Sequence, residues 1–133
     1  MIGLDTNVVV RLFVDDDPVQ AERARAFVAA RCSPAEPGFV NRVSLCETVW
    51  VLRGFGYGRA EIAGVVEALA GARDILVEDA DAVRAALAGF RATNIDFADL
   101  LIAETNRARG CAATATFDRK ALKLPLFAGV SLP

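Results

Sequence analysis

The chain begins with MIGLDTN, residues 1–7, in which a short and mostly apolar run meets an acid at Asp5. An apolar run of this length predicts a buried strand over residues 1–4. The apolar residues that continue over 7–14 predict a helix immediately after it. Asp5 is therefore expected at the carboxyl end of a strand, and ligands of parallel sheets bind beyond this end of the strands.

The rest of the sequence continues this alternation of strands and helices. Asp17 and Pro18 form a good N-cap and first turn for a second helix that ends near Arg31. Further helices are expected over residues 45–53, 59–70, 79–90 and 96–109, and further strands over 39–41, 75–77 and 111–116 and near Val130. The alternation predicts a three-layer α/β/α sandwich with a central parallel sheet, of the Rossmann-like kind, formed by residues 1–133 as a single domain.

The composition limits the classes of protein to which the chain can belong. With 133 residues, of which 54% are hydrophobic, the chain is long and apolar enough to bury a core. No apolar run approaches the ~18 residues that span a membrane, and the N-terminus lacks the basic region of a secretory signal. We therefore expect a cytoplasmic protein without a membrane partner.

The chain contains no histidine, which restricts the chemistry that it can perform. Ser-His-Asp and Cys-His catalysis are excluded, and so are nearly all common zinc sites. The three cysteines, Cys32, Cys46 and Cys111, are widely spaced and form no Cys-x-x-Cys motif, and Cys46 and Cys111, in apolar surroundings, are expected to be small core residues. The net charge of −2 argues against binding nucleic acid through a basic face alone. It does not argue against an acidic site, because bound cations reverse the local charge.

Acidic residues fall at the ends of predicted strands and at the starts of predicted helices. Asp5 and Asp118 end apolar strands. Glu47 is expected in the first turn of the third helix, and Asp96 and Asp99 are expected in the first turn of the sixth. All of these positions lie near the same edge of a parallel sheet, so four or five carboxylates could meet in one pocket.

Each acid also has a purely structural interpretation. The Ser-x-x-Glu pattern that ends at Glu47 fits a capping box, in which the glutamate only completes the helix start. Asp96 is suited to cap its helix and Asp99 to interact with the helix dipole. Asp5 and Asp118 are suited to cap the elements that follow them. The set as a whole favours a shared site, because a carboxylate that ends a buried strand must be paired, neutral or metal-bound.

A shared carboxylate pocket predicts a particular chemistry. Carboxylates in one pocket repel one another unless a cation enters. Oxygen-only ligand sets favour Mg²⁺, and Mn²⁺ can substitute for it. Such ions hold a phosphodiester, turn a water molecule into a nucleophile and stabilise the leaving oxygen without any histidine. The sequence therefore favours metal-dependent hydrolysis of a phosphodiester.

Four short motifs, in this order along the chain, resemble those of PIN-domain nucleases: LDTN at residues 4–7, Glu47 inside a helix, DFADLLIA at 96–103 and TFD at 116–118. The resemblance covers essentially the whole chain, and the compact length is similar to that of VapC-type toxins of bacterial toxin–antitoxin modules. It implies that four acids are catalytic and bind metal: Asp5, Glu47, Asp99 and Asp118. It also implies an additional acid at the metal, Asp96, and supporting roles for Thr6, Asn7 and Thr116.

The same resemblance implies what the protein does and which partners it has. The implied activity is that of a Mg²⁺-dependent endoribonuclease, with RNA as its substrate. The implied partners are a second copy of the chain, in a homodimer, and a small antitoxin protein, in a heterocomplex. Apolar residues on the second and fourth helices are candidates for antitoxin docking, unless they simply pack inside the protein: Ala24, Phe27, Val28, Ile62, Val65 and Leu69.

Three other functions are open at this point. A haloacid-dehalogenase-type phosphohydrolase also has an Asp after its first strand, but it needs a second acid two residues later, where this chain has Asn7. A receiver domain needs paired acids before the first helix, whereas the acids at 15–17 come too late. A catalytically inactive PIN-like binding module would keep the motifs without cleaving RNA.

Overall fold

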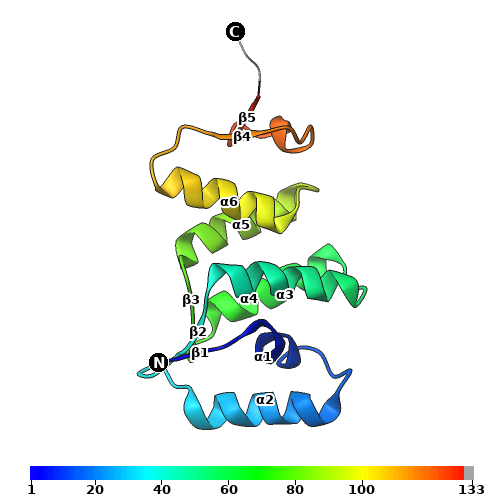
Figure 1. Cartoon of the computed structure of the whole chain (residues 1–133), viewed down its shortest axis with the longest axis vertical. Helices are drawn as coiled ribbons and strands as arrows, with labels where there is room; N and C mark the ends of the chain where they lie inside the picture. Colours follow the sequence, from blue (N-terminus) through cyan, green and yellow to red (C-terminus); the bar gives the residue numbers. More distant parts are fainter. Residues whose placement is uncertain (131–133) are drawn as a thin grey trace. The chain divides into compact units, whose positions relative to one another are not determined.

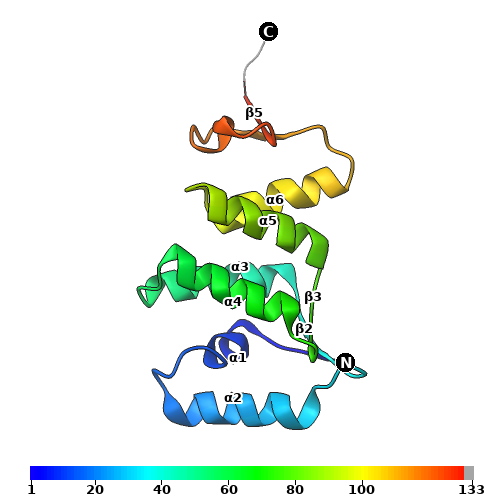
Figure 2. The ribbon, with the colours of Figure 1, turned by 180° about the vertical axis from the view of Figure 1, so that it is seen from behind.

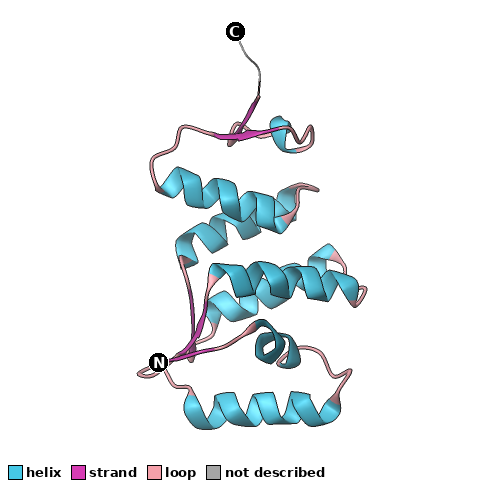
Figure 3. Ribbon diagram, viewed as in Figure 1, coloured by secondary structure: helices cyan, strands magenta, loops and turns pink. Residues whose placement is uncertain are grey.

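The computed structural model describes residues 1–130 of the chain (Figure 1). The chain divides into two compact units, Met1–Ala80 and Asp81–Pro133. Both units combine short strands with longer helices (Figure 3), and the strands that pair do so in parallel. The prediction of an α/β protein with parallel strands is therefore confirmed. No helix among the described residues has the length and apolarity needed to cross a membrane.

The first unit contains a three-stranded parallel sheet and four helices. Its elements are β1 (Ile2–Gly3), α1 (Thr6–Arg11), α2 (Pro18–Arg31), β2 (Gly38–Val40), α3 (Arg42–Gly54), α4 (Arg59–Gly71) and β3 (Ile75–Val77). β2 lies between β1 and β3, with Ile2 opposite Gly38 and Val40 opposite Val77. Because the strands are parallel, the segments that follow β1 and β2 leave the sheet at the same edge.

A core of aliphatic side chains holds the helices of the first unit together. Val9 of α1, Leu45 of α3 and Leu69 of α4 are each at most 1% exposed. α1 packs against α2 and α3, and α3 packs against α4 (Figure 2). Burying one side chain of this size stabilises a fold by ~1.5–3 kcal/mol. The core therefore fixes α1 and α3, the two helices that begin at the carboxyl edge of the sheet.

The apolar residues considered for antitoxin docking mostly belong to this core. The α4 members and two of the α2 members are at most 8% exposed: Ile62, Val65, Leu69, Ala24 and Val28. Within this set Phe27 alone is exposed, with 36% of its surface accessible. For these five residues the alternative, that they pack inside the protein, is therefore confirmed, whereas Phe27 stays exposed and antitoxin docking at this residue stays a prediction.

The second unit combines two helices with a pair of parallel strands. Its elements are α5 (Ala80–Ala92), α6 (Phe97–Ala108), β4 (Thr114–Thr116), a 3-10 turn η1 (Ala121–Lys123) and β5 (Phe127–Gly129). Phe90 of α5 and Phe97 of α6 are almost fully buried and meet edge to face, with their ring centroids 5.9 Å apart. This geometry is favourable for aromatic pairs. The contact fixes the start of α6, where two of the predicted acids lie.

The third helix begins earlier than predicted, and this changes the position of Glu47. The helix starts at Arg42 rather than Leu45. Asn41 is its N-cap, and the Asn41 side chain accepts a hydrogen bond from the backbone N–H of Ser44 at 2.8 Å. Asn is as good an N-cap residue as Ser, and here it comes first along the chain. The predicted capping box is therefore wrong, and Glu47 lies in the second turn of α3.

The strand expected over residues 111–116 is shorter in the structure, and this affects the cysteines. β4 contains only the last three of these residues, so Cys111 precedes the strand and is exposed. The expected structural role of Cys111 in the core is therefore wrong. Cys32 is buried and Cys46 is half-buried, and all three cysteines are free thiols.

Candidate functional site

Asp5 directly precedes α1 and occupies its N-cap position. Its backbone is extended, and its Oδ1 atom accepts a hydrogen bond from the backbone N–H of Val8 at 3.1 Å. The capping interpretation of this residue is therefore confirmed. The Asp5 side chain is exposed, so the expectation that burial forces it to find a partner is wrong. The cap uses only Oδ1 of Asp5, so the Oδ2 atom of the same carboxylate takes no part in the capping hydrogen bond.

A hydrogen bond between side chains connects the start of α1 to α3. The hydroxyl Oγ1 of Thr6 donates to Oε2 of Glu47 at 2.9 Å, although the two residues are 41 positions apart in the sequence. The bond forms because α1 and α3 both begin at the same edge of the sheet. Glu47 is thus tied to the residue that directly follows Asp5. Within the first unit the structure therefore brings three predicted site residues together.

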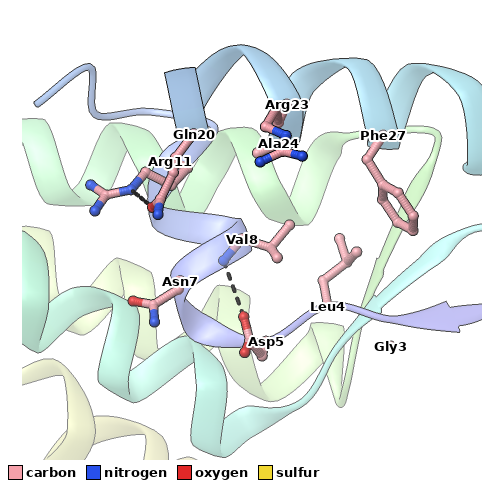
Figure 4. A pocket seen from close by; sticks show the side chains of 10 residues that line it. All are labelled: Gly3, Leu4, Asp5, Asn7, Val8, Arg11, Gln20, Arg23, Ala24 and Phe27. Atoms are coloured by element: carbon pink, nitrogen blue, oxygen red, sulfur yellow. Dashed lines mark hydrogen bonds between the residues drawn. The ribbon is translucent and has the colours of Figure 1, made fainter. Parts of the chain in front are cut away.

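Asp5 and Asn7 also line a pocket of the first unit, with a volume of about 530 Å³ (Figure 4). The pocket lies between α1 and α2, and its other lining side chains include Leu4, Val8, Arg11, Gln20, Arg23, Ala24 and Phe27. The two arginines were not among the predicted site residues. The four-residue spacing of Arg23 and Phe27 indicates that they share one face of α2.

Asp96 and Asp99 lie at the start of α6, as predicted. Asp96 is the N-cap residue by position, but its side chain makes no capping hydrogen bond. The capping interpretation of Asp96 is therefore wrong. Asp99 lies in the first turn and is half-buried. The positive end of the helix dipole favours a negative charge at this position.

Asp118 lies two residues after β4, in the turn that leads to η1. Its Oδ1 atom accepts a hydrogen bond from the backbone N–H of Lys120 at 2.9 Å. Its own backbone N–H donates to the hydroxyl Oγ1 of Thr116 at 3.0 Å. The capping interpretation of Asp118 is therefore confirmed. As with Asp5, the side chain is exposed rather than buried, and one carboxylate oxygen is held by the backbone.

The acids of the second unit act on one another electrostatically. Burial raises the pKa of the Asp99 carboxyl, and the negative charges of Asp96 and Asp118 raise this pKa further. Like charges at such a site are relieved when a cation enters. Three of the five predicted acids therefore form one electrostatic cluster.

The metal-binding capacity of the acids can be judged from their chemistry and their spacing. Hard carboxylate oxygens are the ligands that Mg²⁺ prefers, so the set of side chains fits a divalent cation. Within residues 1–130, however, no three Asp, Glu or Cys side chains are grouped closely enough to hold a metal ion. The structure thus gives two groups of predicted residues, one in each unit: Asp5, Thr6, Asn7 and Glu47, and Asp96, Asp99, Thr116 and Asp118.

The raised pKa of Asp99 predicts how an Asp99→Asn variant unfolds. A carboxyl whose pKa is raised by folding stabilises the protein below its unfolded pKa, and this contribution is lost as the pH rises through the folded pKa. The neutral amide should therefore raise the free energy of unfolding at pH 7, and the gain should disappear near pH 4. Chemical denaturation at both pH values measures this.

The matched control for this experiment is Asp81→Asn. Asp81 is also an acid in the first turn of a helix, but it is exposed on α5. A loss of stability at pH 7 in the Asp99 variant, equal to that in the Asp81 variant, would show that Asp99 serves mainly the helix dipole.

A comparison with protein families identifies the chain. A sequence model of the PIN domain matches residues 2–125, which include nearly all of both units. No protein with a curated description matches the chain. PIN domains are generally metal-dependent nucleases, and the match confirms the predicted α/β, PIN-like fold class. Because the match covers nearly the whole chain, it argues against the haloacid-dehalogenase and receiver-domain alternatives. The chain belongs to the PIN domain family.

Proposed function

We propose that this chain is a Mg²⁺-dependent endoribonuclease that hydrolyses RNA phosphodiester bonds. The observation that carries the proposal is that the second unit brings Asp96, Asp99 and Asp118 close enough to act on one another, so that burial and the charges of the other two acids raise the pKa of Asp99. Titratable groups that are perturbed in this way, at the motif positions of a nuclease family, are candidates for a functional site. The membership of the PIN domain family supports the same activity.

The proposal assigns metal binding and catalysis to four acids, Asp5, Glu47, Asp99 and Asp118, with Asp96 as an additional ligand. A bound Mg²⁺ or Mn²⁺ ion would lower the pKa of a water molecule and offset the charge of the phosphate. The proposal treats residues 1–133 as one nuclease domain, of which 131–133 lie outside the described residues.

The contribution of the chain itself is to orient these carboxylates. The backbone N–H of Val8 donates to one carboxylate oxygen of Asp5, and the backbone N–H of Lys120 donates to one carboxylate oxygen of Asp118. The Thr6 hydroxyl holds Oε2 of Glu47. Outer partners of this kind fix the orientation of metal ligands and raise the affinity of a site. The proposed supporting role of Thr6 follows from its bond to Glu47, and that of Thr116 from the hydrogen bond that its hydroxyl accepts from the Asp118 N–H. Asn7 is assigned its role by the motif alone.

Cleavage of RNA by the purified protein tests the proposed activity. We expect cleavage with Mg²⁺ or Mn²⁺ and none with EDTA. Loss of a ligand should slow cleavage by roughly a hundredfold or more, since even outer partners of metal ligands contribute 10–100-fold. This applies to Asp5→Asn, Glu47→Gln, Asp99→Asn and Asp118→Asn, whereas Asp96→Asn should only weaken cleavage and Asp81→Asn should leave it unchanged.

The same assay decides between this proposal and a second candidate function. The alternative is a PIN-like module that keeps the motif acids and binds a partner without cleaving RNA. A protein that stays folded and leaves RNA intact in Mg²⁺ and in Mn²⁺ would establish that module. Undiminished cleavage in EDTA would contradict the metal mechanism instead.

We further propose that the protein acts in the cytoplasm as the toxin of a toxin–antitoxin pair, as a homodimer or bound to a small antitoxin. This rests on the likeness of the motifs and chain length to VapC-type toxins. Since the α4 face is buried, the antitoxin must use another surface.

Bacterial growth tests the toxin role. Expression of the chain alone should arrest growth, and Asp5→Asn, expressed at the same level, should be tolerated because the nuclease is inactive. The growth curves of the two strains measure the difference. Equal growth of the two strains, together with no protein that co-purifies from the native host, would remove the support for a toxin.

A further inference from the structure

We propose that the pocket between α1 and α2 binds one base of a single-stranded RNA beside Asp5, with Phe27 stacking on the base and Arg23 contacting a phosphate. The pocket lies entirely within the first unit, and its volume of about 530 Å³ is in the range of small-molecule sites. The identification of the ligand as RNA rests on the proposed function. The aromatic surface of Phe27 and the positive charge of Arg23 are observed among the residues that line the pocket.

The apolar wall of the pocket offers a surface for a base. Leu4, Val8 and Ala24 line it beside Phe27, whose ring points from α2 toward Leu4 (Figure 4). Phe27 keeps 36% of its surface exposed, beside Leu4 and Ala24, which are buried. The guanidinium of Arg31 lies 5.7 Å from the ring centroid, over one face of the ring. The exposed part of the ring is the surface that we propose for stacking.

The basic residues of the pocket differ in their availability to a ligand. Arg11 is committed, because its Nε atom donates to Gln20 Oε1 at 3.1 Å and its guanidinium forms an ion pair with Asp16. Arg23 is exposed and makes no ion pair or hydrogen bond with any residue in the range 1–130. It lies one turn of α2 before Phe27, on the same face. An unpaired guanidinium beside an aromatic surface suits a nucleotide, because it can bind the phosphate while the base stacks.

The position of Asp5 places the pocket beside the proposed metal site. Asp5 lines the pocket, and it is also one of the proposed metal ligands. A base seated against Phe27 would therefore hold the neighbouring phosphodiester next to an acid of the active site. Stacking accepts any base, so the pocket should position single-stranded RNA rather than read its sequence. A flexible single strand is the substrate class that can place a base in such a pocket.

Binding without cleavage tests the pocket independently of the nuclease activity. The probe is hexauridylate, added to the ¹⁵N-labelled full chain in EDTA, and amide chemical shifts report both the site and the Kd. We expect shifts at Val8, Ala24 and Phe27. Phe27→Leu should weaken binding by about tenfold or more, as is typical when a stacking ring is lost, and Phe27→Tyr should retain it.

The salt dependence of binding tests Arg23 separately. One lost phosphate contact should reduce the slope of log K against log salt by about 0.7 for a single strand. Arg23→Gln should show this reduction, whereas Arg73→Gln, at an exposed position after α4, should keep the wild-type slope. The preserved dispersion of amide signals shows that each variant is folded.

The outcomes separate this proposal from the proposed function. RNA binding that depends on Phe27, in a protein that never cleaves RNA, would support the pocket and reject the nuclease. Cleavage by a protein whose Phe27→Leu and Arg23→Gln variants bind hexauridylate within twofold of wild type would reject the pocket and keep the nuclease. Loss of a co-purifying protein in Phe27→Leu, with RNA affinity unchanged, would assign the pocket to a protein partner and overturn the proposal.

Discussion

The parallel pairing of β1 with β2 is the constraint on which the first unit depends. The backbone N–H of Leu4 donates to the carbonyl oxygen of Phe39 at 2.8 Å and extends the pairing beyond the last residue of β1. The contact is close at Gly38, where an added Cβ atom would lie 2.8 Å from Leu4 Cδ1. This pairing sends the chain out of both strands at one edge, so that Asp5 and Asn41 each begin a helix there.

Two different interactions organise the acids of the two units. In the first unit the hydroxyl of Thr6 orients Glu47, and such a bond contributes roughly 0.5–1.5 kcal/mol to stability. In the second unit burial and like-charge repulsion raise the pKa of Asp99, which lowers stability at neutral pH. Local features that weaken a fold are expected at functional sites rather than elsewhere. The cluster around Asp99 is such a feature.

The sequence predicted those features whose cause is local. The start of α2 is an example, because Asp17 accepts a hydrogen bond from the N–H of Gln20 only three residues away. The predicted start of α3 was wrong because two residues, Asn41 and Ser44, are both suited to be its N-cap. β2 ends at Val40, so Asn41 is the first residue after the strand and becomes the N-cap. The exposure of Asp5 and the pocket at Phe27 were beyond prediction, since both depend on how α1 packs against α2. The order of the four motifs along the chain was sufficient to predict the family.

The central claim is that the acids of the PIN motifs bind a divalent cation, and thermal unfolding with and without Mg²⁺ tests it most directly. A ligand that binds only the folded state raises its stability, by about 2.7 kcal/mol at a hundred times the Kd. The account predicts that Mg²⁺ raises the Tm of the wild-type chain and leaves the Tm of Asp5→Asn and Asp99→Asn unchanged. An equal rise in all three proteins, or none in the wild type, would contradict it.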